Sequence, residues 1–204
     1  IGLVEGLADA SSKILMSVTG FVSDTIHKRK LFVTLGYSFS ALSHLTMALS
    51  TSWPLVLFSR VLNRSGKGLR TSARDALITE STEKENRGLS FGIHRTMDGL
   101  GGVLGPILSI WLLYLFAQNY KLIFFLAFIP AVLGALIVYL FVKDNTKKKG
   151  DDLSMRFEWK KTSSAFKVFL VISFIFAIGN SSDAFLILRS QNLGMSVSLT
   201  IFAY

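Results

Sequence analysis

The stretch from residue 121 to residue 142 reads KLIFFLAFIPAVLGALIVYLFV, and its single charged side chain is the lysine at its first position. As an α-helix these residues would rise roughly 33 Å. That is enough to cross the ~30 Å hydrocarbon core of a bilayer. A run this long and this apolar predicts a transmembrane helix.

Apolar stretches of similar length lie on both sides of this segment. We place them at residues 1–23, 31–50, 53–78, 88–117 and 166–189, with the start of another near residue 195. Six long apolar helices could not be buried in one small soluble core. The sequence therefore predicts an all-α, polytopic membrane protein with about six to seven transmembrane helices. Both ends of the chain lie in apolar runs, so we interpret it as a fragment of a longer protein.

The net charge of +9 is unevenly distributed, and the chain contains no cysteine. Basic side chains gather in alternate connections: His27 to Lys30; Lys84 and Arg87; and Lys143, Lys147 to Lys149, Arg156, Lys160, Lys161 and Lys167. The intervening connections hold Lys121 and Arg189. Loops rich in Lys and Arg stay cytoplasmic, so we expect residues 24–30 and 143–165 on the cytoplasmic side of the cell (inner or plasma) membrane. Topology thus explains the basic balance without nucleic acid as a partner.

The end of the first segment reads Gly20-Phe-Val-Ser-Asp24-Thr-Ile-His27-Lys28-Arg29-Lys30. It resembles the loop signature G-x-L-x-D-R-x-G-R-K of the major facilitator superfamily, which joins helices 2 and 3, although Thr25 and His27 depart from it. A glycine lets two helices approach closely. An aspartate beside cations at the membrane edge can form a breakable ionic contact. We therefore interpret Gly20, Asp24, Lys28 and Arg29 as a cytoplasmic latch loop.

Two further signatures follow in the order that this family has them. Arg60-Val-Leu-Asn63-Arg64-Ser-Gly66 resembles the helix 4 pattern R-x-x-Q-G-x-G, with Arg64 in place of a glycine. Gly92, Gly101, Gly105 and Pro106 reproduce the helix 5 spacing G-x8-G-x3-G-P. The glycines suit a close-packing surface, and together with Pro106 they suit a helix that must itself flex or rock. By this resemblance the chain is identified as a member of the major facilitator superfamily, in a bacterial and archaeal branch.

The resemblance also divides the chain into parts. It implies that residues 1–142 are helices 2–6 of the N-terminal half, and that residues 143–165 are the cytoplasmic central linker. Residues 166–204 would then be helix 7 and the beginning of helix 8, at the start of the C-terminal half. In this family, helices 4 and 7 line the central cavity, which by resemblance places Arg60, Arg64 and Asp183 beside the transport path.

Charged side chains inside the predicted helices are the main functional candidates. Each costs about 2.5–3.5 kcal/mol at a helix centre on insertion scales. Glu5 and Asp9 are one turn apart, and Arg60, Asn63 and Arg64 share one polar arc, with Arg64 near the midplane. The carboxylates either lock two helices together or carry protons. The arginines either pair with these carboxylates or bind an anionic group through their donor fork.

These residues predict a secondary active transporter that moves a small solute by alternating access. Proton-coupled efflux (antiport) is our first interpretation, since carboxylates and arginines share the predicted helices and the helix 5 motif is associated by resemblance with antiporters. The alternatives are proton symport of an anionic metabolite, or a lipid-translocating or non-transporting relative. Expected partners are the lipid bilayer, a small-molecule substrate and protons. No pattern indicates an enzyme, a metal site or a cofactor.

Overall fold

The computed structural model describes residues 2–26, 28–117, 119–144, 162–179, 183–196 and 199–200; for Gly179 and Asp183 it describes the backbone alone. Most of the described residues are helical and none forms a strand, which confirms the predicted all-α class. The helices are α1 (Gly2–Ile26), α2 (Arg29–Ala48), α3 (Trp53–Ser81), the short 3-10 helix η1 (Lys84–Asn86), α4 (Arg87–Leu115), α5 (Tyr120–Phe141), α6 (Ser164–Gly179) and α7 (Asp183–Asn192).

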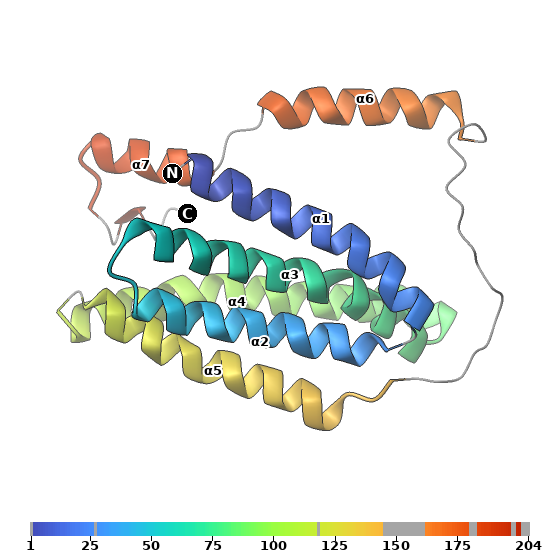
Figure 1. Ribbon diagram of the computed structural model, residues 1–204, viewed down its shortest axis with the longest axis horizontal. Helices are drawn as coiled ribbons and strands as arrows, with labels where there is room; N and C mark the ends of the chain where they lie inside the picture. Colours follow the sequence, from blue (N-terminus) through green and yellow to red (C-terminus); the bar gives the residue numbers. More distant parts are fainter. Residues whose placement is uncertain are drawn as a thin grey trace.

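Helices α1 to α5 run side by side as an up-and-down bundle (Figure 1). Helix α3 is its centre, because it packs along α1 on one side and along α2 on the other, and α5 covers the outer side of α2. Helix α4 touches α3 and α5 more lightly, and α6 lies apart from the bundle (Figure 1). The arrangement places the charged helices α1 and α3 against each other.

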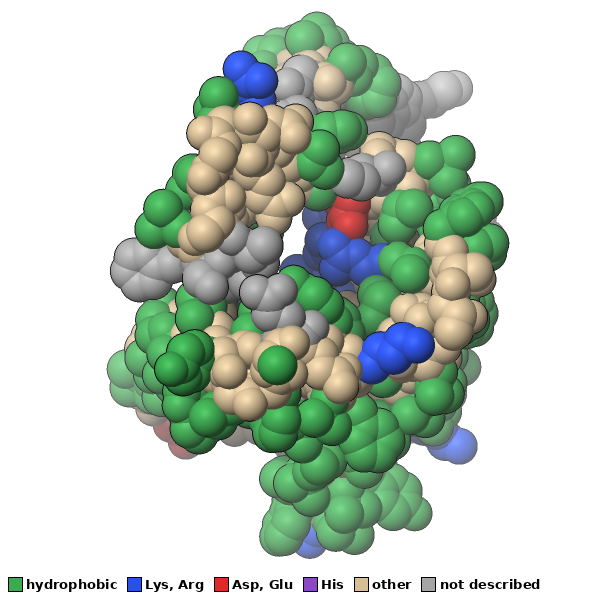
Figure 2. All heavy atoms as spheres, turned by 90° about the vertical axis from the view of Figure 1, so that its left-hand side faces the viewer, with side chains coloured by type: hydrophobic (Ala, Val, Ile, Leu, Met, Phe, Trp, Pro, Cys, Tyr) green, Lys and Arg blue, Asp and Glu red, His purple; other side chains and the backbone are tan. Residues whose placement is uncertain are grey.

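The distribution of polarity is the reverse of that in a water-soluble protein. The largest fully buried side chains are Thr19, Ser23, Ser43 and Ser59, whereas large apolar side chains such as Trp111, Phe141 and Phe169 are exposed. The apolar side chains that cover much of the outer surface in Figure 2 suit contact with lipid tails. Small buried side chains let membrane helices approach closely. Both features agree with a protein that spans a membrane.

Among the residues that the structure describes, three helical stretches are long and apolar enough to cross a bilayer: Arg29–Ala48, Lys84–Leu115 and Tyr120–Phe141. Helices α1 and α3 have 25 and 29 residues, so their length would also be sufficient. They differ in composition because both carry several charged side chains. Those charges pair largely between the two helices, as described below.

Glycines set the closest helix crossings. A Cβ atom placed on Gly36 of α2 would lie 2.6 Å from the carbonyl oxygen of Gly66 on α3, and one on Gly66 would lie 2.6 Å from that of Gly36. A Cβ on Gly68 would collide with the carbonyl oxygen of Ser12 on α1. Only a hydrogen fits at these positions, so α3 lies in backbone contact with both neighbours.

One predicted segment is described in two parts. The stretch 166–189, expected as a single transmembrane helix, is described as α6 ending at Gly179 and α7 beginning at Asp183. The chain at this point reads Gly179-Asn-Ser-Ser-Asp183. Glycine has low helix propensity, and Asn, Ser and Asp favour helix ends over helix interiors. Residues 180–182 and most of the expected linker, residues 145–161, lie outside the described part of the chain.

Candidate functional site

Glu5 of α1 joins two arginines of α3. Its Oε1 atom accepts hydrogen bonds from Arg60, at 3.0 Å from Nε and at a shorter distance from Nη2. Its Oε2 atom lies 3.7 Å from Nη2 of Arg64. One carboxylate therefore holds two guanidinium groups that sit one turn apart on the facing helix. Since the Glu5 side chain is only 9% exposed, its charge depends on these two partners.

Asp9 completes the cluster one turn further along α1. Its Oδ1 atom lies 3.2 Å from Nε of Arg64. Glu5, Asp9, Arg60 and Arg64, which we call the four-charge cluster, contain two anions and two cations and are neutral as a set. The structure thus brings together four of the six residues predicted for the transport path, in the paired arrangement. No anionic ligand is needed to balance the two arginines.

The cluster lies toward the end of the bundle where α1 and α3 begin. Viewed from that end, the molecule is hollowed, and acidic and basic side chains are visible inside the hollow (Figure 2). Side-chain exposure rises from Glu5 to the other members, with 43% for Arg60, 32% for Arg64 and 54% for Asp9. The cluster is therefore buried at Glu5 and more exposed at its other three members.

Asn63 has a different neighbourhood from the two arginines. Its Nδ2 atom donates to Oγ of Ser43 on α2 at 2.8 Å, and Oγ of Ser59 donates to the carbonyl of Ser43 at 2.6 Å. Arg70 also turns toward α2, where its Nη1 atom donates to Oγ of Ser40 at 2.7 Å. These contacts form a polar seam between α2 and α3. Asn63 thus joins two helices, and its part in a transport path stays a prediction.

The predicted latch loop lies at the other end of the bundle, which we call the latch end. Arg29 binds Asp24 at 2.8 Å and reaches Glu80, near the end of α3, at 2.5 Å. The backbone N–H of Lys30 donates to Asp144, which follows α5, at 2.7 Å. Four helices are therefore tied together here. Gly20 faces Ser72 with room for a Cβ at 3.7 Å, and Lys28 is exposed at the start of α2.

The predicted glycine motif lies on α4, on a face without a close neighbour in the described chain. A Cβ placed on Gly92, Gly101 or Gly105 would meet no heavy atom of the described residues within 4 Å, and Pro106 lies within the helix. Close packing by this motif therefore stays a prediction. The side chain of Asp183, the remaining predicted path residue, lies outside what the structure describes.

Sequence reasoning missed several partners of the predicted residues. Glu80 and Asp144 at the latch end, Ser43 in the seam, and Gly36 and Gly68 at the crossings all act through contacts between helices. One signal was present for the glycines. Gly36 and Ser40 have the small-xxx-small spacing of close membrane helices, which could have marked this face of α2.

Comparisons with known proteins agree with this architecture. The family model described as Major Facilitator Superfamily matches residues 10–204. An uncharacterized MFS-type transporter of Methanocaldococcus jannaschii is 40% identical over 199 residues, covering 97% of this chain and 49% of that protein. One from Bacillus subtilis is 32% identical over 100 residues, covering 49% of this chain and 19% of that protein.

The chain matches only part of the length of these relatives. It spans about half the length of the archaeal relative and a smaller share of the other. The family model nevertheless covers nearly all of the residues, from the middle of α1 onward. The signatures around Asp24, Arg60 and Gly101 and the extent of that match lead to one conclusion: the chain belongs to the Major Facilitator Superfamily.

Proposed function

We propose that the protein containing this chain is a secondary active transporter that moves a small solute across the cell membrane by alternating access, coupled to protons. The observation that carries the proposal is Glu5, a carboxylate 9% exposed that holds Arg60 and Arg64 across a helix interface. Such residues within membrane helices mark ion and substrate paths. Membership of a family whose relatives are named transporters favours transport over catalysis.

In this proposal Glu5 alternates between two states. Ionised, it holds both arginines against α1; protonated, it is neutral and keeps at most a weaker hydrogen bond to them. The arginines released by protonation would then be free to reorient or to bind an anionic group of the solute through their donor forks. Asp9 would remain as the counter-charge of Arg64. Proton binding and solute binding would thereby act on the same side chains.

The rest of the described chain fits roles in alternating access. Residues 1–142 would form most of the N-terminal half, residues 143–165 the cytoplasmic linker, and residues 166–204 the start of the C-terminal half, which rocks against the first. The contacts of Arg29 with Asp24 and Glu80 would hold the latch end closed in one state. The open glycine face of α4 would be the surface on which the second half moves.

We propose efflux in exchange for protons as the direction, since the glycine spacing of α4 resembles that of antiporters. Proton symport of an anionic metabolite is the second candidate, because protonation of Glu5 would uncover two arginines. The full-length protein in proteoliposomes, with a pH-sensitive dye inside, separates them. We would apply gradients of carboxylates, lipophilic cations and sugars in turn. Under antiport, a solute that leaves the vesicle should acidify the interior; under symport it should make the interior alkaline.

Empty vesicles provide the control for that measurement. A solute that moved without any proton flux would contradict the coupling and leave facilitated transport. If no solute class moved in any direction, while the protein was folded in the vesicles, the transport proposal itself would be wrong. The alternatives of a lipid-translocating or non-transporting protein would then be preferred.

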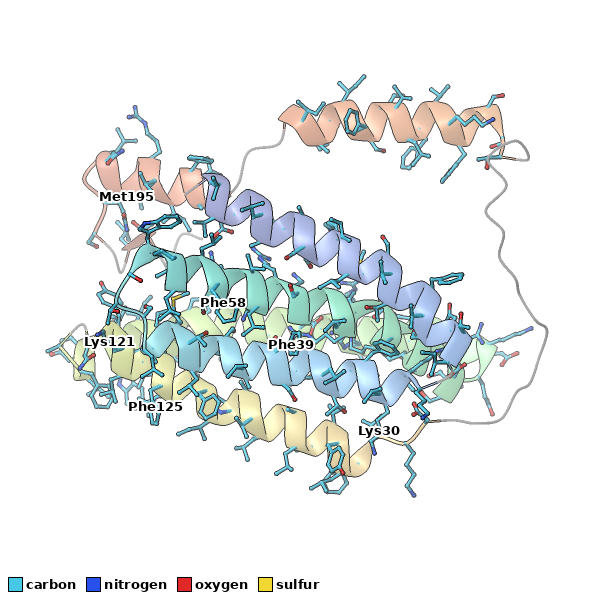
Figure 3. The ribbon with its side chains drawn as sticks, in the orientation of Figure 1. Lys30, Phe39, Phe58, Lys121, Phe125 and Met195 are labelled. Carbon is cyan, nitrogen blue, oxygen red and sulfur yellow. The ribbon has the colours of Figure 1, made fainter. Side chains whose placement is uncertain are left out.

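The two ends of the bundle should face opposite sides of the membrane. Lys30 and Lys121 lie at opposite ends (Figure 3), and basic residues concentrate around the former. A cysteine introduced at Lys148, in the linker, should be labelled from the cytoplasmic side, and one at Ser50, between α2 and α3, from the outside. The chain has no cysteine of its own to interfere. Labelling of both positions from one side would overturn this topology.

A further inference from the structure

A second set of charged side chains lies between α3 and α4, away from the four-charge cluster. Oδ2 of Asp98 lies 3.4 Å from Nε2 of His94, one turn earlier on α4, and 3.8 Å from Nη1 of Arg74 on α3. The transport mechanism proposed above does not use these residues. They nevertheless lie within helices of membrane-spanning length, where titratable side chains are costly and rarely without a function.

The Asp98 side chain is more exposed than that of Glu5, and its contacts are longer than those between Glu5 and Arg60. The Asp98 side chain is 52% exposed, against 9% for Glu5. Nε2 of His94 and Nε of Arg74 are both buried and have no hydrogen-bond partner in the described part of the chain. The carboxylate therefore has an open side, and two polar atoms beside it still have unused hydrogen-bonding capacity. Such a carboxylate can exchange a proton without first breaking a closed network.

The depth of this site along the helices also differs from that of the four-charge cluster. Ten residues of α3 separate Arg64 from Arg74, which corresponds to about 15 Å along the helix. This is about half of the ~30 Å hydrocarbon core. The four-charge cluster lies toward the end where α3 begins, so Asp98 lies toward the latch end. The two sites would face opposite halves of the membrane.

We propose that Asp98, with His94 and Arg74, is a second protonation site, on the latch-end side of the proton path; this rests on the proton-coupled transport proposed above. A hydronium ion gives its proton to the Asp98 carboxylate, leaving a carboxylic acid and one water molecule, and the reverse step releases the proton on the other side. Protonation removes the negative charge that faces Arg74. The arginine then retains Asp75, at 3.5 Å from its Nε atom, as its carboxylate neighbour.

The surroundings of Asp98 favour a proton over a metal cation. Arg74 of α3 and His94 of α4 contact Asp98, Arg70 of α3 interacts with it electrostatically, and Asp75 contacts Arg74. In the described part of the chain, no three acidic, His or Cys side chains gather in a way that could hold a metal ion. A proton needs only the carboxylate oxygen.

Infrared difference spectroscopy of the purified full-length protein tests the site directly. Spectra at acid minus neutral pH report each protonated carboxyl group through its C=O stretching band. Asp98→Asn should lose one such band, whereas Asp75→Asn, which removes the other carboxylate beside Arg74, should keep it. His94→Gln leaves the carboxyl group in place and should shift the frequency of the same band. Glu5→Gln should lose a different band.

The outcomes separate this inference from the proposed function. If Asp98→Asn folds and its spectrum is unchanged, or if His94→Gln shifts no band, the second protonation site is wrong even when the Glu5 band is present. If the Asp98 band is found but Glu5→Gln changes nothing, the protonation site holds and the role proposed for Glu5 fails. Proton flux into proteoliposomes should be lost in Asp98→Asn and retained in Asp75→Asn. Full flux in Asp98→Asn would also overturn the inference.

Discussion

Replacing Glu5 with glutamine should abolish proton-coupled transport while leaving exchange of labelled solute across the membrane. A glutamine amide keeps the size of the side chain, yet it does not ionise. The side chain at position 5 could therefore no longer alternate between an ionised and a protonated state, and Arg60 would lose the carboxylate that holds it. Loss of a group that transfers a proton typically costs about a hundredfold or more in rate. Dye-loaded proteoliposomes would measure the proton flux, and counterflow of labelled solute would measure exchange.

The matched control is Glu85→Gln, which removes an exposed carboxylate in η1 without touching the four-charge cluster. It should transport normally.

The double variant Glu5→Gln with Arg60→Gln distinguishes an effect on folding from an effect on proton coupling. Removing both charges avoids leaving Arg60 unpaired, so the yield of folded protein should recover, but proton flux should not. Full proton flux in Glu5→Gln would show that the cluster is a structural tie between α1 and α3.

A valine at Gly36 should prevent assembly of the bundle. Its Cβ would lie 2.6 Å from the carbonyl oxygen of Gly66, 2.7 Å from Cβ of Arg70 and 2.9 Å from the backbone nitrogen of Arg70. Two of these atoms belong to the backbone of α3, so no side-chain rotation relieves the clash. The helices would have to separate, at a cost of about 3 kcal/mol or more. Thermal unfolding of the detergent-solubilised protein, followed by size-exclusion chromatography, would report the loss.

Gly134→Val on α5 provides the comparison, because a Cβ at Gly134 meets no heavy atom of the described residues within 4 Å. Both substitutions place a β-branched side chain in a membrane helix, so their intrinsic effects on the helix are similar. The thermal midpoint of Gly134→Val should stay near that of the unmodified protein. Equal stability of the two variants would mean that α2 and α3 do not cross at Gly36.

The parts of the fold that depend on local composition could be predicted from the sequence. A long run with one charge, such as residues 121–142, has few alternatives to a transmembrane helix. The pairing of Glu5 and Asp9 with Arg60 and Arg64 was one of two interpretations of the sequence. Residues four apart lie on the same face of a helix, so two carboxylates on one helix can face two arginines on another. Helical spacing therefore narrowed the candidate site to a few residues.

Contacts between distant segments could not be predicted in the same way. Asn63 lies on the polar arc of α3, yet which helix it faces depends on how α3 packs, and the structure turns it to Ser43 of α2. Asp24 was expected to contact a cation of its own loop, and Arg29 lies only five residues after it. The second partner of Arg29, Glu80, lies fifty-one residues away along the chain. A single sequence indicates that a side chain needs a partner inside the membrane. It does not say from which helix the partner comes.

The hydrogen bond between Lys30 and Asp144 has a consequence for biosynthesis. Lys30 lies in the first turn of α2, and the residue before that helix offers no side-chain cap. The acceptor that satisfies it comes 114 residues later in the chain. At translation rates of about 5–20 residues per second, roughly 6 to 23 s pass between synthesis of the two residues. During that interval the Lys30 N–H lacks this acceptor, so the tie between α2 and the end of α5 forms only after the ribosome has completed α5, later than the contacts of Arg29 with Asp24 and Glu80.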